Sequence, residues 1–374
     1  MRAFNLCIIK PNDNSFSETF IRDHIEQLPG NKKVLYGGAF PVYDDQGKYL
    51  IRSKVGLLIY LIQKRVFHKQ DIAVRNHALI NYLKKEKIDV VLAEYGMVGA
   101  MVTQACKSAG VPLVVHFHGA DVHHRPTLEK YAGFYPAMFA YASGMIAVSY
   151  DMTDALARLG ADKSKIVWNP CGVDTDKFKR IDIRHSPPNF LSIGRFVEKK
   201  SPTSVVRAFD IVTGECPDAK LTMVGQGPLF EETKSLINEL GLNRKVTLTG
   251  VLDSGTIRKL IRQSRCFVQH SITAADGDKE GTPVTILEAG SSGLAIVSTA
   301  HTGIKEAVIN GETGYLVAEH DIEGMARYMI QLAKDAKLAS ALGLKEAEHI
   351  RTNYNMKDRI DTLAKVLTGA IKRN

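Results

Sequence analysis

The sequence predicts an α/β protein made of two doubly wound domains, each a parallel sheet with helices on both faces. Apolar runs of strand length alternate with amphipathic stretches of helical length along the chain. This alternation is typical of strands joined by covering helices. A chain of 374 residues is long enough for two or three domains that each bury a core. The hydrophobic fraction of 45% and the charged fraction of 24% are ordinary globular values.

The expected elements follow in chain order. Apolar runs in the first half predict strands at 4–9, 34–36, 90–94, 113–116, 145–149 and 166–168. Those in the second half predict strands at 190–193, 221–224, 246–249, 266–269, 295–298 and 315–317. Segments with helical length and period include 201–212, 229–240, 256–263 and 322–333.

A Ser-Pro-Pro sequence at 186–188 predicts a turn or linker between the two blocks. We therefore expect an N-terminal domain at 1–183 and a C-terminal domain at 184–354. The stretch 356–372 predicts a final helix, long enough to leave the second domain. We expect this C-terminal segment, about 355–374, to pack back onto the first domain.

The cysteines and the N-terminus favour an intracellular setting. Five cysteines occur singly, without a CxxC pair (Cys7, Cys106, Cys171, Cys216 and Cys266). Single cysteines in apolar surroundings are typical of reduced thiols in a cytosolic protein. The N-terminus lacks the flanks of a signal peptide, and no run approaches the roughly 20 apolar residues of a spanning helix. We therefore expect a soluble, cytoplasmic protein.

The formal charge of +9 is concentrated in one segment. Residues 48–87 hold ten Lys and Arg against two acidic residues, a net +8. Within this segment the apolar run 55–62 lies between Arg52 and Lys54 on one side and Lys64 and Arg65 on the other. Basic residues beside apolar surface favour an anionic membrane surface as partner. The alternative is a buried helix with snorkelling lysines. Nucleic-acid binding is disfavoured, because no interleaved aromatic residues accompany the charge.

The most informative segment is 278–290, which contains two glutamates eight positions apart, Glu280 and Glu288. If Thr282 caps a helix whose first residue is Pro283, the opening amides of that helix form an anion site. One carboxylate can then hold a sugar hydroxyl and the other a ribose, with phosphates on the amides between them. The alternative is a capped helix with two solvated carboxylates.

Three further features follow strands of the second domain, where doubly wound sheets gather ligands. Arg195, after Gly194, and Lys200 would set two cations against a diphosphate; the alternative is a solvated loop of mixed charge. Gly225 and Gly227 give a tight turn at which backbone can approach a ligand, although a simple turn is as good an explanation. Backbone groups near Val251 could contact a base.

In the first domain, His118, Gly119 and Asp121 leave a strand at its carboxyl end. His116 shares the face of His118 along the strand and could support it. His123 and His124 could complete a metal site with His118 and Asp121, but nothing fixes four ligands in a tetrahedron, so we expect no metal. Asp276 and Asp278 are likewise expected to be solvated.

Together these residues resemble the retaining glycosyltransferases of family 4, whose GT-B architecture has two Rossmann-like domains facing across a cleft. The resemblance covers essentially the whole chain and rests on the motifs quoted above, together with the stretch Asn169 to Asp174 (Asn-Pro-Cys-Gly-Val-Asp). Ser17 and Glu18 begin a Ser-Glu-Thr-Phe sequence similar to that of bacterial exopolysaccharide, capsule and lipopolysaccharide enzymes. The loop 11–17 has no glycine, unlike that of many relatives, and Ser17 and Glu18 could take over there.

The resemblance implies a role for each residue. Arg195 and Lys200 hold the donor diphosphate. Backbone amides between Thr282 and Thr285 aid them, in the segment that also contains Gly281, Pro283 and Val284. Glu280 meets hydroxyls of the transferred sugar, and Glu288 holds the ribose. His118 contacts the sugar near its anomeric carbon, and Asp121 fixes the loop. Because cations and helix amides lie where the leaving phosphate gains charge, no metal or other cofactor is expected.

The expected function is transfer of a sugar, with retention, from a UDP- or GDP-sugar to a glycan or lipid-linked acceptor in bacterial cell-surface polysaccharide or glycolipid synthesis. The expected location is peripheral, at the inner face of the cytoplasmic membrane. Two alternatives are another GT-B enzyme, such as a nucleotide-sugar epimerase or a phosphorylase, and a non-catalytic nucleotide-sugar-binding subunit of a membrane complex. No nucleic-acid partner is expected.

Overall fold

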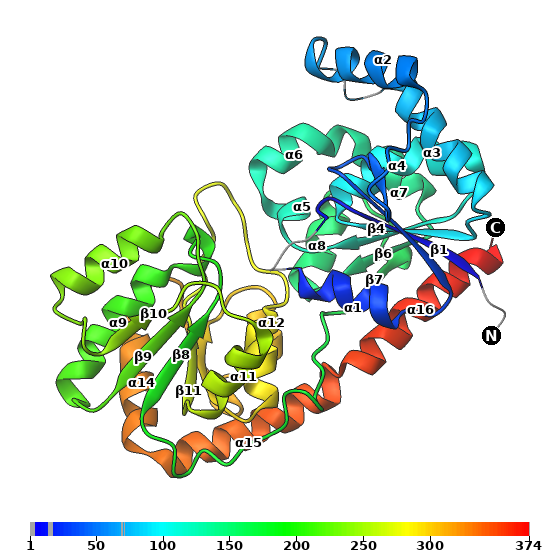
Figure 1. Cartoon of the computed structure of the whole chain (residues 1–374). Helices are drawn as coiled ribbons and strands as arrows, with labels where there is room; N and C mark the ends of the chain where they lie inside the picture. The colour runs from blue at the N-terminus through cyan, green and yellow to red at the C-terminus, as the bar shows by residue number, and fades with distance from the viewer. Residues whose placement is uncertain (1–3, 14–17, 69, 71, 374) are drawn as a thin grey trace. The chain divides into compact units, whose positions relative to one another are not determined.

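The computed structural model describes residues 4–13, 18–68, 70 and 72–373. The chain divides into two compact units (Figure 1). The first unit comprises Met1–Asn169 and Ile360–Asn374, and the second comprises Pro170–Arg359.

The first unit is built on a seven-stranded sheet in the order β3-β2-β1-β4-β5-β6-β7. Its strands are β1 (Asn5–Lys10), β2 (Asn31–Tyr36), β3 (Tyr43–Asp44), β4 (Val90–Glu94), β5 (Leu113–Phe117), β6 (Gly144–Ala147) and β7 (Ile166–Trp168). All neighbours are parallel except β3, which pairs antiparallel with β2. The order reverses at β1 and β4, which is where doubly wound sheets bind ligands.

The second unit has a six-stranded parallel sheet in the order β10-β9-β8-β11-β12-β13. Its strands are β8 (Asn189–Ile193), β9 (Lys220–Val224), β10 (Val246–Leu248), β11 (Cys266–Gln269), β12 (Ala295–Thr299) and β13 (Gly314–Val317). The switch point lies between β8 and β11.

Helices connect these strands. In the first unit they are α1 (Thr19–Gln27), α2 (Lys54–Arg65), α3 (Ala73–Lys85), α4 (Gly96–Ala109), α5 (Ala120–His123), α6 (Arg125–Tyr131), α7 (Tyr135–Tyr141) and α8 (Tyr150–Arg158). In the second they are α9 (Pro202–Glu215), α10 (Phe230–Glu239), α11 (Ser254–Arg262), α12 (Val284–Ser291), α13 (Ile304–Ala307), α14 (Ile322–Lys334) and α15 (Ala336–Asn353). The last helix, α16 (Met356–Arg373), begins in the second unit and continues into the first.

Local sequence explains several helix ends. Ser149 caps α8 by accepting the Met152 amide, and Asp253 caps α11 by accepting two amides. Such caps satisfy backbone donors that have no partner inside the helix. Gly110 ends α4 in the left-handed conformation that glycine tolerates.

The α/β class with two parallel sheets is confirmed, and the predicted strands 90–94, 166–168 and 266–269 match β4, β7 and β11 residue for residue. The boundary between the units differs from 183/184. Val173, Phe178 and Ile183 are buried in the core of the second unit, so that unit already begins at Pro170. The five cysteines are free and buried. Among the helices of the described residues, none has the length and apolar character needed to cross a membrane.

Candidate active site

In the second unit, two glycines let the turn after β9 pack against the segment after β8. Gly225 has φ +140°, and a Cβ there would lie 1.9 Å from the Gly194 carbonyl oxygen. Gly227 has φ +158°, and its Cβ would lie 2.4 Å from the Phe196 carbonyl oxygen. Only glycine fits such a close approach. The turn predicted to approach a ligand thus also contacts the backbone on both sides of Arg195.

The predicted cation and carboxylate form a buried pair at the carboxyl ends of these strands. Lys200 Nζ lies 3.1 Å from Glu280 Oε2 and donates to Gln269 Oε1 at 3.2 Å. Arg195, Lys200 and Gln269 also line one small cavity of about 20 Å³. Arg195 itself is exposed. The structure therefore brings both predicted cations and Glu280 to the same end of the sheet.

Electrostatics keep Glu280 charged in spite of its burial. Burial alone would raise the pKa of Glu280, but Lys200 and Lys199 more than offset this and hold it below its usual value. Burial lowers the pKa of Lys200, and the Glu280 carboxylate opposes that effect. Glu280 is 7% exposed, and its Oε1 is buried without a hydrogen-bond partner among the described residues. A carboxylate oxygen in that state can accept a hydrogen bond from a ligand hydroxyl.

Residues that the sequence did not single out hold Glu280 in place. Its N–H donates to His301 Nε2 at 3.2 Å, and its carbonyl accepts from Thr302 Oγ1 at 2.8 Å. His301 Nδ1 lies 2.6 Å from Glu319 Oε1. Because Nε2 accepts, the ring proton is on Nδ1 and is donated to Glu319. Only Gln269 carried a usable signal, as a polar residue at the carboxyl end of a buried strand.

The helix after Glu280 begins later than predicted. Pro283, not Thr282, occupies the N-cap of α12, and no side chain caps the helix. Proline before the first helical residue has extended φ and ψ, so Val284 becomes the first residue in place of Pro283. Glu288 is then the fifth residue of α12 and is half-buried, and Gly281 is buried in the preceding loop.

Two remaining predictions for this unit can be placed. Val251, just after β10, is 52% exposed, and Gly225 N–H donates to the neighbouring Gly250 carbonyl at 2.9 Å. Asp278 was predicted to be solvated. Instead, its carboxylate forms an ion pair with Lys199, with Nζ 3.0 Å away. That contact neutralises the carboxylate.

In the first unit, Asp121 fixes the loop that carries His118. The Asp121 carboxylate accepts from the amides of His118 at 3.0 Å, Gly119 at 2.9 Å and Gly96 at 2.8 Å. The His118 ring stacks on Phe20 with centroids 4.3 Å apart. Three backbone donors on one buried carboxylate make this loop rigid.

His118 belongs to a cluster around Glu94, which the sequence analysis did not identify. Glu94 ends β4, and its oxygens lie 2.7 Å from His24 Nδ1 and 2.9 Å from His118 Nε2. His116 is buried beside His118, and burial holds its pKa well below the usual value. Of the described groups, those close enough to share a metal ion are His24, Glu94 and His116, rather than the set considered with His123 and His124.

On the acceptor side, Glu18 Oε1 accepts from Tyr95 OH at 3.1 Å and from Asn12 Nδ2 at 3.0 Å. Ser17 lies outside the described residues. One carboxylate, that of Glu18, thus connects Asn12 after β1 with Tyr95 after β4.

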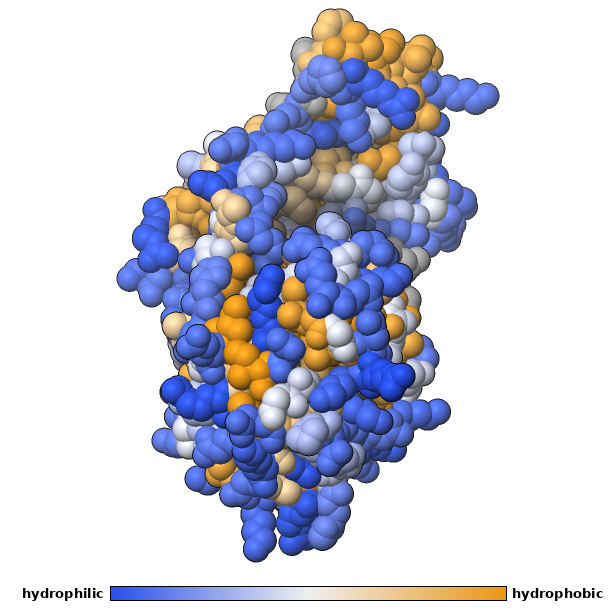
Figure 2. All heavy atoms as spheres, turned by 90° about the vertical axis from the view of Figure 1, so that its left-hand side faces the viewer, coloured by the Kyte–Doolittle hydropathy of each residue, from blue (hydrophilic) through white to orange (hydrophobic). Residues whose placement is uncertain are grey.

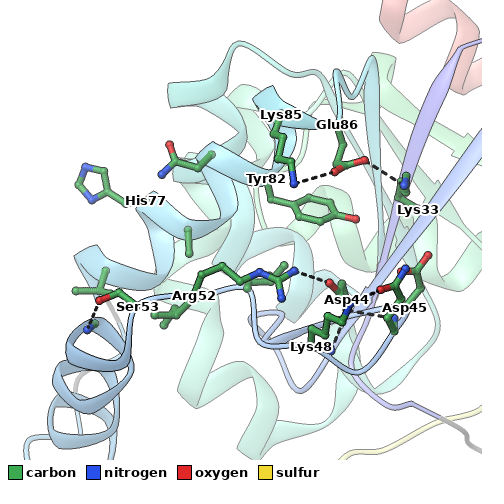
Figure 3. Close-up of a pocket in the computed structure, with 17 residues that line it drawn as sticks. Lys33, Asp44, Asp45, Lys48, Arg52, Ser53, His77, Tyr82, Lys85 and Glu86 are labelled. Atoms are coloured by element: carbon green, nitrogen blue, oxygen red, sulfur yellow. Dashed lines mark hydrogen bonds and ion pairs between the residues drawn. The ribbon is translucent and has the colours of Figure 1, made fainter.

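A larger cavity, of about 630 Å³, lies elsewhere in the first unit, beside α2 and α3 (Figure 3). Its wall contains ion pairs of Arg52 with Asp44 at 2.8 Å and Lys33 with Glu86 at 3.1 Å. None of the predicted site residues lines it. The predicted residues Arg195 and Lys200 line the smaller cavity instead.

Solved structures share the fold of this chain. The sucrose-phosphate synthase of Thermosynechococcus elongatus superposes with a TM-score of 0.77 over 99% of this chain and 100% of that one, at 17% identity. The Anabaena protein Alr3699/HepE, solved with UDP and glucose, has a TM-score of 0.74 over 98% and 100%, at 16% identity. Two Rossmann-like units with this likeness define a protein of the GT-B class.

The sequence comparisons specify the family. Residues 57–177 match "Glycosyltransferase Family 4", and residues 173–349 match "Glycosyl transferases group 1". The amylovoran biosynthesis glycosyltransferase AmsK of Erwinia amylovora is 30% identical over 283 residues, which is 75% of this chain and 70% of that protein. The putative colanic acid biosynthesis glycosyltransferase WcaL of Salmonella typhimurium is 27% identical over the same shares. The chain therefore belongs to the glycosyltransferases that combine these two domains.

Proposed function

We propose that this glycosyltransferase transfers a sugar from a UDP- or GDP-sugar to a glycan or lipid-linked acceptor, with retention of anomeric configuration, in bacterial cell-surface polysaccharide or glycolipid synthesis. The observation that carries the proposal is the buried Lys200–Glu280 pair, in which one carboxylate oxygen is without a partner among the described residues. The names of AmsK and WcaL, and the UDP and glucose bound by Alr3699/HepE, support the polysaccharide setting and the donor type.

Each step of the proposed reaction follows from charge and geometry. Breaking the sugar–diphosphate bond puts negative charge on the departing phosphate, where Arg195, Lys200 and the first amides of α12 stabilise it. Glu280 Oε1 accepts a hydrogen bond from a hydroxyl of the transferred sugar and so orients the sugar. Glu288 binds the ribose, and backbone groups near the exposed Val251 contact the base.

Retention follows in this scheme from attack on the same face from which the diphosphate leaves, with the phosphate accepting the proton of the acceptor. Glu280 is not the nucleophile in this scheme, because Lys200 holds its Oε2 and its Oε1 orients a sugar hydroxyl. No metal takes part in the proposal, since Arg195, Lys200 and helix amides already offset the phosphate charge. Turnover is therefore expected to survive EDTA, and its loss, reversed by magnesium or manganese, would contradict this point.

We also propose that the first unit binds an anionic membrane surface through α2. Six apolar residues in and just after this helix are at least 40% exposed: Val55, Leu58, Ile59, Ile62, Val66 and Phe67. Figure 2 shows apolar surface at the top of the view, where α2 lies. Lys54, Lys64 and Arg65 are exposed on the same helix. The alternative, a buried α2, is wrong, because Tyr60 is the one residue of the twelve in this helix that is buried.

The decisive experiment incubates the protein with UDP- and GDP-sugars, with and without a lipid-linked glycan acceptor, and identifies products by NMR. A glycoside with the anomeric configuration of the donor supports the proposal. Epimerised nucleotide sugar without acceptor would point to another GT-B enzyme. Donor binding by calorimetry without any turnover would point to a non-catalytic subunit.

A further inference from the structure

A fully buried carboxylate lies at the centre of the histidine cluster of the first unit. Glu94 is 0% exposed. Its Oε1 accepts from His24 Nδ1 at 2.7 Å, its Oε2 accepts from His118 Nε2 at 2.9 Å, and His116 Nδ1 lies 3.6 Å from Oε2. The family resemblance implies that His118 contacts the donor sugar, but it gives Glu94 no role.

The charge of Glu94 determines which nitrogen of a neutral His118 ring carries the proton. Burial would raise the pKa of Glu94, but His24, His118 and His116 hold it well below its usual value, so the group is a carboxylate. A carboxylate only accepts hydrogen bonds. A neutral His118 therefore carries its proton on Nε2, and Nδ1 is the acceptor that faces away from Glu94.

The surroundings leave the His118 ring one orientation. It stacks on Phe20 at 4.3 Å and packs against Tyr95 at 4.7 Å. The His118 amide is held by Asp121. Glu94 closes the remaining side through Nε2. An imidazole fixed in this way presents Nδ1 in one direction.

We propose that Glu94 is a positioning residue for His118: its carboxylate sets the tautomer and the plane of the imidazole, so that Nδ1 meets the donor sugar. This inference rests on the proposed role of His118 in transfer. It parallels the general use of a buried carboxylate to orient a reacting histidine.

The other charged groups around the cluster are already engaged. Asp121 accepts three backbone amides. Glu18, in front of α1, accepts from Tyr95 OH and Asn12. His24 from α1 and His116 from β5 face Glu94 but offer no negative charge. In the described part of this cluster, Glu94 is thus the carboxylate in contact with the imidazoles.

A metal site is the competing explanation, because ligand atoms of His24, Glu94 and His116 lie within 4.8 Å of one another. Both Glu94 oxygens, however, already accept imidazole N–H groups. Direct metal analysis separates the two explanations.

The test compares Glu94→Gln with Glu94→Asp and with a matched buried carboxyl, Glu346→Gln. The Gln amide keeps the size of Glu94 but sets an NH₂ group against one of the two imidazoles, which breaks one contact. Turnover of Glu94→Gln is expected to fall about 10- to 100-fold, the effect of losing a hydrogen bond to a charged group. The affinity for UDP or GDP, measured by calorimetry, should stay unchanged, because Arg195 and Lys200 belong to the second unit.

The pH profile adds a readout that a merely structural role would not move. Without the carboxylate, protonated imidazole is less stable, so the histidine limb of the kcat profile should move to lower pH in Glu94→Gln. Glu94→Asp should recover part of the activity. Glu346 is 0% exposed, and burial raises its pKa to about 8, so Gln replaces a neutral group and both readouts should match the wild type.

Histidine nitrogen NMR tests the inference without turnover: His118 should be protonated on Nε2 in the wild type and lose this preference in Glu94→Gln. Wild-type turnover and pH profile in a folded Glu94→Gln variant would overturn the proposal. One equivalent of cobalt bound by the wild type, and lost in Glu94→Gln, would replace it with a metal site. If the wild type were inactive with every nucleotide sugar, the proposed function would be contradicted instead. The NMR result would still decide whether Glu94 sets the tautomer of His118.

Discussion

At the residue scale, Arg195 and Lys200 differ in burial although both are assigned to the diphosphate. Arg195 is exposed, whereas the Lys200 side chain is 16% exposed and pairs with a Glu280 side chain that is 8% exposed. Removing one partner of a buried pair leaves an uncompensated charge, which typically costs about 3–5 kcal/mol. Measurements of unfolding stability should therefore distinguish the loss of Lys200, which leaves Glu280 unpaired, from the loss of the exposed Arg195.

Arg195→Ala is expected to weaken UDP and GDP binding about 10- to 100-fold while leaving the urea midpoint unchanged. Lys200→Ala should weaken binding and also lower the midpoint, because Glu280 is left buried. Glu288→Ala should weaken nucleoside binding too. Calorimetry and urea unfolding measure the two effects. Unchanged nucleotide affinity in the Arg195→Ala/Lys200→Ala double variant would show that the diphosphate assignment is wrong.

A buried histidine makes the second unit sensitive to acid. Burial lowers the pKa of His270 from its usual 6.5 to about 4. The unfolded chain thus binds more protons than the folded one between these values, so stability is lost as pH falls from 6.5 toward 4, by up to about 3 kcal/mol. His270→Gln should flatten the loss of urea midpoint between pH 7 and pH 4.5. An equal slope in wild type and variant would mean that other groups bind those protons.

At the element scale, the turn from β9 to α10 depends on the absence of a side chain at Gly225. Its Cβ would overlap the Gly194 carbonyl, and its φ of +140° is strained for other residues. Gly225→Ala should therefore lower the unfolding midpoint and the UDP affinity together, because the displaced backbone flanks Arg195. Gly214→Ala is the matched control: nothing lies within 4 Å of its added Cβ, and alanine in α9 should be neutral or stabilising. Equal behaviour of the two variants would contradict the close-approach explanation.

The sequence predicts such elements well where one pattern dominates, and fails where tertiary contacts decide. The run 90–94 is apolar up to Glu94 and was predicted residue for residue. The strand β3 has two residues and no pattern of its own, so it was missed. The contact between His24 and Glu94 joins residues 70 apart in sequence, and only the packing of α1 beside β4 reveals it. The role of Asp121 was implied by the family resemblance, and its contacts with the neighbouring His118 and Gly119 amides agree with that role, whereas its contact with Gly96, 25 residues earlier, depends on the fold.

At the scale of the whole molecule, the two units carry different chemistry. The family matches divide at residues 173–177, close to the boundary at Pro170. Arg195 and Lys200, the cations proposed to bind the diphosphate, lie in the second unit, and the exposed apolar helix α2 lies in the first. A protein that binds a soluble donor with one unit and a membrane surface with the other needs only reversible attachment.

Liposome sedimentation tests that attachment. Because α2 exposes apolar residues next to Lys54, Lys64 and Arg65, the wild type should sediment with vesicles that contain anionic lipid. Salt should release it, since screening shortens the reach of charge to about 8 Å at physiological strength. Each basic residue near the surface contributes about 1 kcal/mol, so Lys64→Glu/Arg65→Glu should weaken binding on the order of 30-fold or more. Lys107→Glu/Lys163→Glu changes the same charge on exposed positions outside the basic segment 48–87 and should bind as the wild type does. Leu58→Ser should weaken binding to neutral and anionic vesicles alike. A wild type that ignores anionic vesicles at low salt, with donor binding intact, would show that α2 does not attach to membranes.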